Sequence, residues 1–549
     1  MKSNKQWTQL FLGLLFIIAL NGCKGSSDGT PAAATSPTPT GPTVTLSGTL
    51  TYDYVSASTG KLNYAGTTQL PMRNVYVKLL NSNTDTVLGS TSTNDSGQYS
   101  ISVADGSPVK LRIYAEMKTP PVIIQNNTAS KAQYTLLSSN FTISGNTTKD
   151  VNAASGWSGS NAAGSYTSTR AAAPFAMLDS IYTITKKMSA ARPALVFPTC
   201  KINWSISNIA VSGDKTIGQI GTSHYSSADN ELYILGQADV DSDEFDKHVI
   251  VHEWGHYFEN NLSRSDSGGG SHGTGDKKDM SLAFGEGWGN ALSAMTFDPD
   301  VLYTDTSGAR QQSGFQINME SGADANKGWF SETSVQQILY DIYDTVNEAG
   351  DNLSLGIGPI VDVFTGFEKT TTAATSIFSF VHGLKASQPA TSADLDTLVA
   401  TKSIDSITSQ YGTGETHDGG WNKNLPVYNS ITLGGAAVPV SLYGDFGASD
   451  FYGLFNTVFN NKYLRFTATT TTTRLVVTTT DTFQIEVYKK GVQVAVYYRQ
   501  RTSAAAIGPF TFNITTVAGQ EYSVLILTAQ DVVFDSAAVV DLTVTGSAI

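Results

Sequence analysis

Hydrophobic and polar positions alternate along two long stretches of the chain, one near each end. Residues 75–79 and 99–103 show this alternation between 45 and 151, and residues 484–488 and 522–527 show it between 432 and 549. A period of two places every second side chain on the same face of a strand, and clusters of turn residues separate the runs. The pattern predicts an all-β sandwich domain at 45–151 and another at 432–549.

The period changes in the middle of the chain. Hydrophobic residues at helical spacing predict helices at 173–190, 245–260, 282–295 and 393–411, and the run 231–235 is typical of a strand. This mixture predicts an α+β domain at 169–431. Residues 152–168 are rich in Gly, Ser and Ala and are predicted to be a linker. The predicted fold class is therefore multidomain, with an α+β catalytic-type domain flanked by two β-sandwiches.

The first 44 residues carry export signals. Lys2 and Lys5 precede an apolar run at 10–20, which is too short to cross a bilayer but suits the core of a signal peptide. The stretch 20–23, which ends in Gly22 and Cys23, resembles the lipobox of bacterial lipoproteins. The resemblance implies a signal peptide at 1–22, a lipid on Cys23 and a flexible tether at 23–44. We therefore expect a chain anchored by lipid at the bacterial cell envelope, and Lys24 favours the outer membrane.

Composition narrows the function classes. Charged residues make up 15% of the chain, and 34 basic against 47 acidic residues give a net charge of −13. A surface without basic clusters cannot release the counterions of nucleic acid, so we expect no nucleic-acid partner. The only other cysteine is Cys200, which has no partner within the chain if Cys23 is lipidated.

The predicted helix at 245–260 contains an HExxH motif. His252 and His256 are four residues apart and so lie on one helix face, where both imidazoles can reach one Zn²⁺. Glu253 stands next to His252 and is predicted to act as general base on water. The motif predicts one catalytic zinc ion with His252 and His256 as ligands.

A catalytic zinc needs a third protein ligand. Metzincins carry a glycine and a third histidine at the positions of Glu259 and Leu262, so that class is excluded. Two candidates remain. Asp276 ends the sequence Gly-Thr-Gly-Asp, which resembles an element of aspzincins, and Glu286 lies in the glycine-rich apolar stretch 284–290.

The stretch 284–290, Phe-Gly-Glu-Gly-Trp-Gly-Asn, is similar to the third-ligand element of the fungalysin and thermolysin-like gluzincins. Over roughly 231–295 the chain resembles this group of zinc endopeptidases. The resemblance implies that Glu286 is the third ligand and opens its helix, and that the strand 231–235 is an edge strand that pairs with substrate. Family members commonly have an acid where this chain has Asn290, which can orient a histidine but brings no charge. The sandwich at 45–151 is similar to regulatory-type domains, and that at 432–549 to pre-peptidase C-terminal domains.

The remaining histidines, two tyrosines and a group of acids are further candidates for functional or structural roles. In gluzincins a downstream His or Tyr stabilises the oxyanion, and His417 in a polar loop is favoured here over Tyr340 and Tyr343. His224, His248, His272 and His382 are predicted to be packing or solvent-facing histidines. Alternate acids at Asp239, Asp241 and Asp243 make calcium a further candidate, although acids that cap the next helix are the favoured interpretation.

Together these features predict a zinc-dependent endopeptidase that acts on proteins or peptides and contacts the membrane through its lipid only. A different class remains open. The chain could instead be a surface adhesion or glycan-binding lipoprotein with a vestigial metal site, and zinc binding without proteolysis would favour that alternative.

Overall fold

The structure is a computed structural model that describes residues 41–443, 456–479, 483–499, 509–527 and 539–549. The predicted signal peptide, most of the predicted tether and Cys23 lie outside these residues. Within the described ranges, no helix combines the length and the apolar character needed to cross a membrane.

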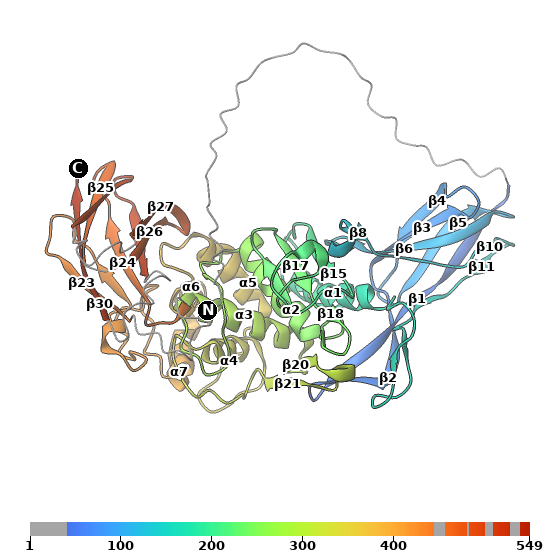
Figure 1. Cartoon of the computed structure of the whole chain (residues 1–549), viewed down its shortest axis with the longest axis horizontal. Coiled ribbons are helices and arrows are strands. Elements are labelled where there is room, and N and C mark those ends of the chain that lie inside the picture. The colour runs from blue at the N-terminus through green and yellow to red at the C-terminus, as the bar shows by residue number, and fades with distance from the viewer. Residues whose placement is uncertain (1–40, 444–455, 480–482, 500–508, 528–538) are drawn as a thin grey trace, which may run out of the picture. The chain divides into compact units, whose positions relative to one another are not determined.

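The chain is multidomain as predicted, with a β-rich N-terminal region, a central α+β region and C-terminal β sheets (Figure 1). In the N-terminal region, β1 pairs with β2, β5, β11 and β12, and a larger sheet has the order β16-β17-β15-β7-β6-β3-β4. Side chains of β6 alternate between buried and partly exposed, as the period of two predicts. The strands of this region are β1 (Thr43–Ser58), β2 (Lys61–Pro71), β3 (Val75–Asn81), β4 (Val87–Ser92), β5 (Gln98–Ala104), β6 (Pro108–Lys118), β7 (Pro121–Asn126), β8 (Ala132–Gln133), β9 (Thr135–Leu137), β10 (Phe141–Thr142), β11 (Thr147–Thr148) and β12 (Val151–Ala153).

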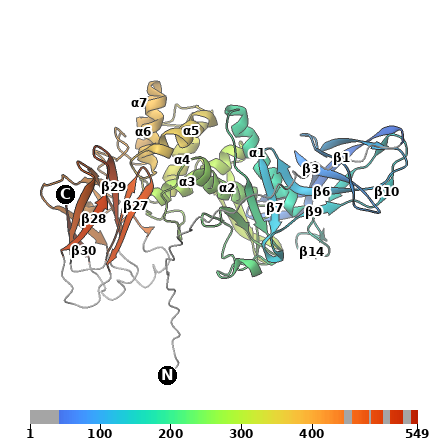
Figure 2. The same ribbon diagram turned by 90° about the horizontal axis from the view of Figure 1, so that it is seen from above.

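The larger sheet continues from the N-terminal region into the central region. β7 pairs in parallel with β15 (Cys200–Trp204), where Cys200 lies opposite Val122, and β15 pairs with β17 (Glu231–Ile234). Helix α1 (Ala173–Ala191) lies beside β6 and β7 (Figure 2). One hydrophobic core therefore extends from the N-terminal strands to the central helices.

The segment 152–168, predicted as a linker, is packed against the N-terminal sheet. It contains the short hairpin of β13 (Trp157–Ser158) and β14 (Ser165–Tyr166). The Trp157 ring stacks on Tyr64 of β2, with ring centroids 3.6 Å apart. The two aromatic side chains explain why this glycine- and serine-rich segment has a fixed path.

The edge of the large sheet differs from the prediction. Strand β17 has β15 on one side and β16 (His224–Ser226) on the other, so it is internal, and β16 forms the edge. The hydrophobic run of β17 is buried at every position, which is typical of an internal strand rather than of an edge.

Helices α2 (Lys247–Leu262) and α3 (Met280–Phe297) pack closely side by side (Figure 1). A Cβ on Gly255 would come within 3.1 Å of the Gly289 Cα atom, so any larger residue would push the two backbones apart by a few tenths of an ångström. Trp288 is fully buried, and its indole N–H donates to the Gly255 carbonyl at 3.2 Å. The glycines near both motifs thus let the two helices that carry them meet.

The remaining elements of the central region surround this pair. The segment predicted as a helix at 393–411 is helical only to Thr401, because Ser403 has a φ of 58° and the chain turns there. The elements are β18 (Gly236–Gln237), β19 (Asp241–Ser242), β20 (Leu302–Ser307), β21 (Ser313–Asn318), α4 (Glu332–Tyr343), α5 (Ile357–Val363), a π-helix (Phe364–Glu368), α6 (Ile377–Ser387) and α7 (Ser392–Thr401).

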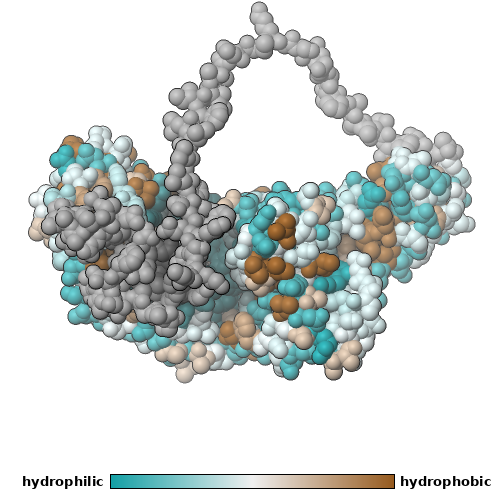
Figure 3. All heavy atoms as spheres, viewed as in Figure 1, coloured by the Kyte–Doolittle hydropathy of each residue, from teal (hydrophilic) through white to brown (hydrophobic). Residues whose placement is uncertain are grey.

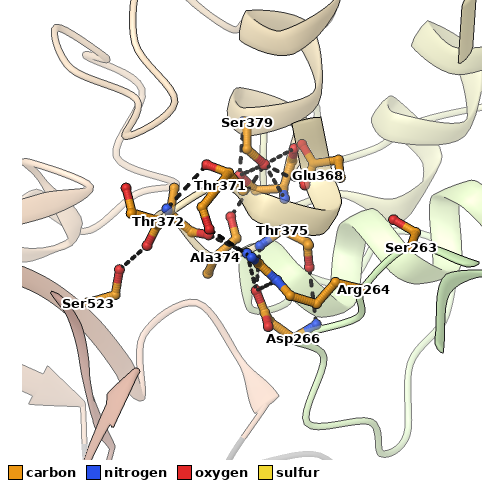
Figure 4. Close-up of polar contacts among 12 residues, drawn as sticks. Ser263, Arg264, Asp266, Glu368, Thr371, Thr372, Ala374, Thr375, Ser379 and Ser523 are labelled. Atoms are coloured by element: carbon orange, nitrogen blue, oxygen red, sulfur yellow. Dashed lines mark hydrogen bonds and ion pairs between the residues drawn. The ribbon is translucent and has the colours of Figure 1, made fainter. Parts of the chain in front are cut away.

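The C-terminal region consists of a five-stranded sheet, β22-β24-β29-β26-β27, and a four-stranded sheet, β23-β30-β25-β28, around a hydrophobic core of their own. Ser523 of β29 donates a hydrogen bond to the Thr372 carbonyl of the central region (Figure 4). The strands are β22 (Tyr428–Ser430), β23 (Val438–Tyr443), β24 (Asn461–Thr467), β25 (Thr472–Thr478), β26 (Phe483–Lys489), β27 (Val492–Arg499), β28 (Phe510–Thr515), β29 (Glu521–Leu527) and β30 (Val539–Ala548).

Hydrophobic side chains reach the surface in small separate groups on the face drawn in Figure 3. Among the residues that the structure describes, the most exposed large hydrophobic one is Val196, at 81%. Isolated exposed hydrophobics of this kind are common on protein surfaces.

Candidate metal centre

The two histidines of the HExxH motif converge as the helical spacing predicts. They lie one turn apart on α2, and their Nε2 atoms are 3.2 Å from each other. His252 is buried, whereas the side chain of His256 is 20% exposed. The pair therefore lines a site that is closed on the His252 side.

Glu286 of α3 completes the group. Its Oε2 atom lies 3.1 Å from Nε2 of His252 and 3.3 Å from Nε2 of His256. A tetrahedral zinc ion with ligand bonds of 2.0–2.1 Å separates its ligand atoms by roughly 3.3 Å, so the three atoms have the spacing of one face of a zinc tetrahedron. His252, His256 and Glu286 thus form a group that fits a metal ion.

Glu286 does not open its helix, contrary to the prediction. Helix α3 begins at Met280, with Asp279 as N-cap accepting a hydrogen bond from the Ser281 N–H. Glu286 therefore lies in the second turn, where backbone hydrogen bonds are complete on both sides and the ligand is held more firmly.

The electrostatics of the group favour a cation. Burial raises the pKa of Glu286, but His256 and His272 offset this effect and hold it well below its usual value. Burial lowers the pKa of His256, while Glu286 and Glu259 raise it well above the usual value. The carboxylate is thus kept ionised by neighbouring positive charge, which a divalent metal would also supply.

Glu253 is a residue of α2, and its side chain reaches the edge strand of the large sheet. Its Oε2 accepts a hydrogen bond of 2.8 Å from the backbone N–H of Tyr225 in β16, and the residue is 9% exposed. This contact fixes the direction of the carboxylate beside His252. Its role as general base remains a prediction.

The outer nitrogens of both histidines face polar side chains. Nδ1 of His252 is 2.9 Å from Oδ1 of Asn290, whose amide donates to Gln336. Nδ1 of His256 lies 3.5 Å from a carboxylate oxygen of the fully buried Glu259, which is an ion-pair distance, and neither Glu259 oxygen has a hydrogen-bond partner. Such partners fix the ring orientation of metal-binding histidines. Glu259 occupies the position where metzincins have glycine. The sequence does not predict its contact with His256.

His272 was predicted to be a packing or solvent histidine, and this prediction is wrong. Its Nε2 lies 3.2 Å from Oε2 of Glu286, and its Nδ1 lies 2.8 Å from Oε2 of Glu332. Burial lowers the pKa of His272, but Glu286 and Glu332 raise it to about 9. No local pattern marks this residue, because it lies in an irregular loop and its contacts come from two separate helices.

Asp276, the alternative third ligand, is turned away from the group. Its Oδ2 pairs with Nζ of Lys278 at 3.2 Å, and its side chain is 49% exposed. The structure thus brings Glu286 rather than Asp276 to the two histidines.

The residues considered for the oxyanion lie elsewhere. The ring of His417 packs against Phe330, with centroids 5.2 Å apart, and its buried Nδ1 has no hydrogen-bond partner. The hydroxyls of Tyr340 and Tyr343 point toward Asp298. Within the described residues, no hydrogen bond joins these three side chains to the histidine–glutamate group, and the oxyanion role of His417 stays a prediction.

A second group of potential ligands lies before α2. Carboxylate oxygens of Asp241, Asp243 and Asp305 lie within 4.8 Å of one another. One oxygen each of Asp241 and Asp243 is buried without a hydrogen-bond partner. Burial and Asp241 raise the pKa of Asp305 to about 7. These three acids therefore also form a candidate cation group.

The favoured interpretation of the acids as helix caps is wrong. The N-cap of α2 is Asp246, which makes no side-chain capping hydrogen bond, and the first turn contains no acid. Asp239 lies outside the acidic group and accepts a hydrogen bond from the Arg310 N–H instead.

Comparisons with known proteins add one family and several structures. None of the curated proteins compared with the chain matches it. Among solved structures, the pre-peptidase C-terminal domain of a Bacillus anthracis collagenase is 13% identical and covers 22% of this chain and 94% of its own, with a TM-score of 0.15. The lysozyme inhibitor PliG of Aeromonas hydrophila is 12% identical and covers 22% and 97%, with a TM-score of 0.14. At these TM-scores neither likeness supports a structural or functional conclusion.

Residues 206–401 match the family model of the mycolysin C-terminal domain. Mycolysin is a metalloprotease. The match contains α2, α3 and all three residues of the histidine–glutamate group. This part of the chain therefore resembles the mycolysin C-terminal domain, and its group of His252, His256 and Glu286 indicates a metallopeptidase.

Proposed function

We propose that the protein is a zinc-dependent endopeptidase that hydrolyses peptide bonds in proteins or peptides. The observation that carries the proposal is the convergence of His252, His256 and Glu286 at the edge lengths of a zinc tetrahedron. Glu253 follows His252 in the sequence of the same helix. Two histidines and one glutamate leave the fourth position open for chemistry. The match to the mycolysin C-terminal domain supports the same reaction class.

When bound, zinc supplies Lewis-acid chemistry, because it polarises a carbonyl and lowers the pKa of water to about 7. Glu253 accepts a proton from the attacking water and passes it to the leaving amine. The Tyr225 N–H holds the carboxylate of Glu253 in place for both transfers. Strand β16, which contains Tyr225, is the sheet edge beside Glu253, so an extended peptide could add to the sheet there.

The test is a Glu253→Gln variant, which keeps the side-chain size and leaves the three ligands unchanged. We expect full zinc content and a loss of proteolysis by several orders of magnitude. Asp362→Asn, a change at an exposed acid that pairs with Arg192, is the control and should retain activity. Near-native proteolysis by Glu253→Gln would contradict the assigned role. Stoichiometric zinc in a wild-type protein that cleaves no tested protein would instead favour the adhesion or glycan-binding alternative.

Anchoring at the cell envelope is proposed from the sequence at 20–23 alone. A Cys23→Ser variant should lose labelling by fatty acid and should no longer enter the detergent phase. Unchanged labelling would exclude lipidation at this residue.

Calcium is proposed for the group of Asp241, Asp243 and Asp305. Calcium prefers carboxylate and carbonyl oxygens, and buried carboxylate oxygens without partners are costly unless a cation neutralises them. Addition of calcium should raise the thermal unfolding midpoint of the wild type, and Asp305→Asn should remove most of this increase. An equal increase in both proteins would exclude the site.

A further inference from the structure

We infer that His272 is a positioning residue for the metal ligand Glu286, and that the loop that carries it is held in place by Asn456 of the C-terminal region. The inference rests on the proposed zinc site. It gives a function to a histidine that no motif contains and to a contact between regions far apart in the sequence.

His272 reaches Glu286 from outside the metal-binding group. Its Nε2 is 3.2 Å from the same Oε2 atom that faces His252 and His256. However, it is not one of the residues whose ligand atoms all lie within 4.8 Å of one another, so it is not a fourth ligand in this arrangement. An ionised carboxylate oxygen has lone pairs for both a metal ion and an N–H donor. The imidazole can therefore hold the carboxylate while the metal binds it.

The ring of His272 is itself oriented. Its Nδ1 lies 2.8 Å from Glu332, which is 4% exposed and occupies the first turn of α4. The contacts run from α3 through the loop to α4. Each ring nitrogen of His272 therefore has a carboxylate partner, and the two partners fix the orientation of the ring. Chains of this kind usually orient the ligand more precisely than the metal bond alone.

The loop needs this support because its sequence favours many conformations. Gly268, Gly269, Gly270 and Gly273 lie close to His272 in the sequence, and glycine loses more conformational freedom on ordering than other residues do. The amide of Asn456 donates to the carbonyls of Gly269 and Ser271 at 3.1 and 3.0 Å. Two peptide groups directly before His272 are thus bound by one side chain from outside the loop.

Both ends of the loop are also fixed. At its start, the Arg264 guanidinium donates to the Thr371 carbonyl, and the carboxylate of Asp266 accepts from the Thr375 N–H at 2.9 Å (Figure 4). At its end, the Asp279 N–H donates to the Asn456 carbonyl at 2.7 Å, and Tyr463 of β24 donates to the Asp279 carboxylate. The C-terminal region therefore holds the middle and the end of the loop, and the central region holds its start.

The experiment measures zinc affinity of the full chain by competition with a chelator and records the visible spectrum of the cobalt-substituted protein. His272→Ala should bind zinc about 10–100-fold more weakly and shift the cobalt bands, as loss of a partner to a metal ligand usually does. His272→Gln can still donate to Glu286 and should recover part of the affinity. His382→Ala, a histidine that packs against Phe367, is the control and should match the wild type.

Two further variants test the support of the ring and of the loop. Glu332→Ala should weaken zinc binding in the same direction, whereas Glu332→Gln keeps an acceptor for Nδ1 and should remain near the wild type. Asn456→Ala should weaken zinc binding a few-fold with little change in the unfolding midpoint.

The outcomes separate this inference from the proposed function. If the wild type binds no zinc, the proposed function fails. If the wild type binds zinc and His272→Ala has native affinity and an unchanged cobalt spectrum, the positioning role is wrong even if turnover falls. If Asn456→Ala leaves zinc affinity and the cobalt spectrum unchanged, the C-terminal region does not hold the loop.

Discussion

The candidate metal centre has two halves that are held by different means. His252, His256 and Glu286 lie on α2 and α3, whose backbones approach closely at Gly255 and Gly289. His272 lies in the loop between these helices and is held by hydrogen bonds from other parts of the chain. Hydrophobic packing fixes the first half, and polar contacts between distant segments fix the second.

The two halves should therefore respond to different changes. Trp288, fully buried between the helices, contributes several kcal/mol through burial, so the ligand geometry on α2 and α3 should survive most surface substitutions. A single hydrogen bond contributes only about 1 kcal/mol, so the loop depends on the sum of several weak contacts. Disturbing a helical ligand should therefore have a much larger effect than disturbing a loop residue.

The largest change in zinc content is expected from removal of a ligand on a helix, and removal of an acid in the loop is its control. Glu286→Ala removes the only anionic atom of the group, and the purified protein should lose most of its zinc and its activity. Asp276→Ala removes a half-exposed acid that pairs with Lys278, and zinc content should stay near native. Metal analysis of both variants measures this directly. Loss of zinc in Asp276→Ala alone would reverse the assignment of the third ligand.

A smaller effect is expected from crowding a ligand without removing it. In Gly289→Ala the new Cβ would lie 2.8 Å from Nδ1 of His252, so the ring must shift and zinc affinity should fall by at least about 10-fold. Gly366→Ala is a matched control, because a Cβ there meets no atom within 4 Å. It should leave affinity unchanged and stabilise the helix slightly. Equal affinities in the two variants would show that the α2–α3 contact tolerates movement.

The smallest effect is expected at the partner of His252. Asn290→Asp places a negative charge 2.9 Å from Nδ1, which should raise the basicity of the imidazole and strengthen zinc binding a few-fold. Part of this increase in zinc affinity is lost, because the Gln336 amide accepts a hydrogen bond from Asn290 in the wild type and must rotate to donate one to an aspartate. Chelator competition reports the net change. Weaker binding in this variant would mean that the link to Gln336 matters more than the charge.

The sequence was sufficient for the helical half of the site because local spacing decides it. His252 and His256 are one turn apart, and the apolar stretch around Glu286 predicts a buried helix, so both features can be seen without knowledge of the fold. No sequence pattern near His272 predicts its contacts with Glu286 and Glu332. Tertiary contacts also explain why β17 is internal rather than an edge, since the strand that covers it, β16, is too short to be recognised from its pattern.

The parallel pairing of β7 with β15 has a consequence for any attempt to divide the chain. A protein that begins at residue 169 would lack β7, so β15 would present a row of unpaired backbone N–H and C=O groups at a new hydrophobic edge. Such edges promote aggregation between copies. The N-terminal strands thus belong to the same folded body as the central region, and a shortened protein intended for production should keep them.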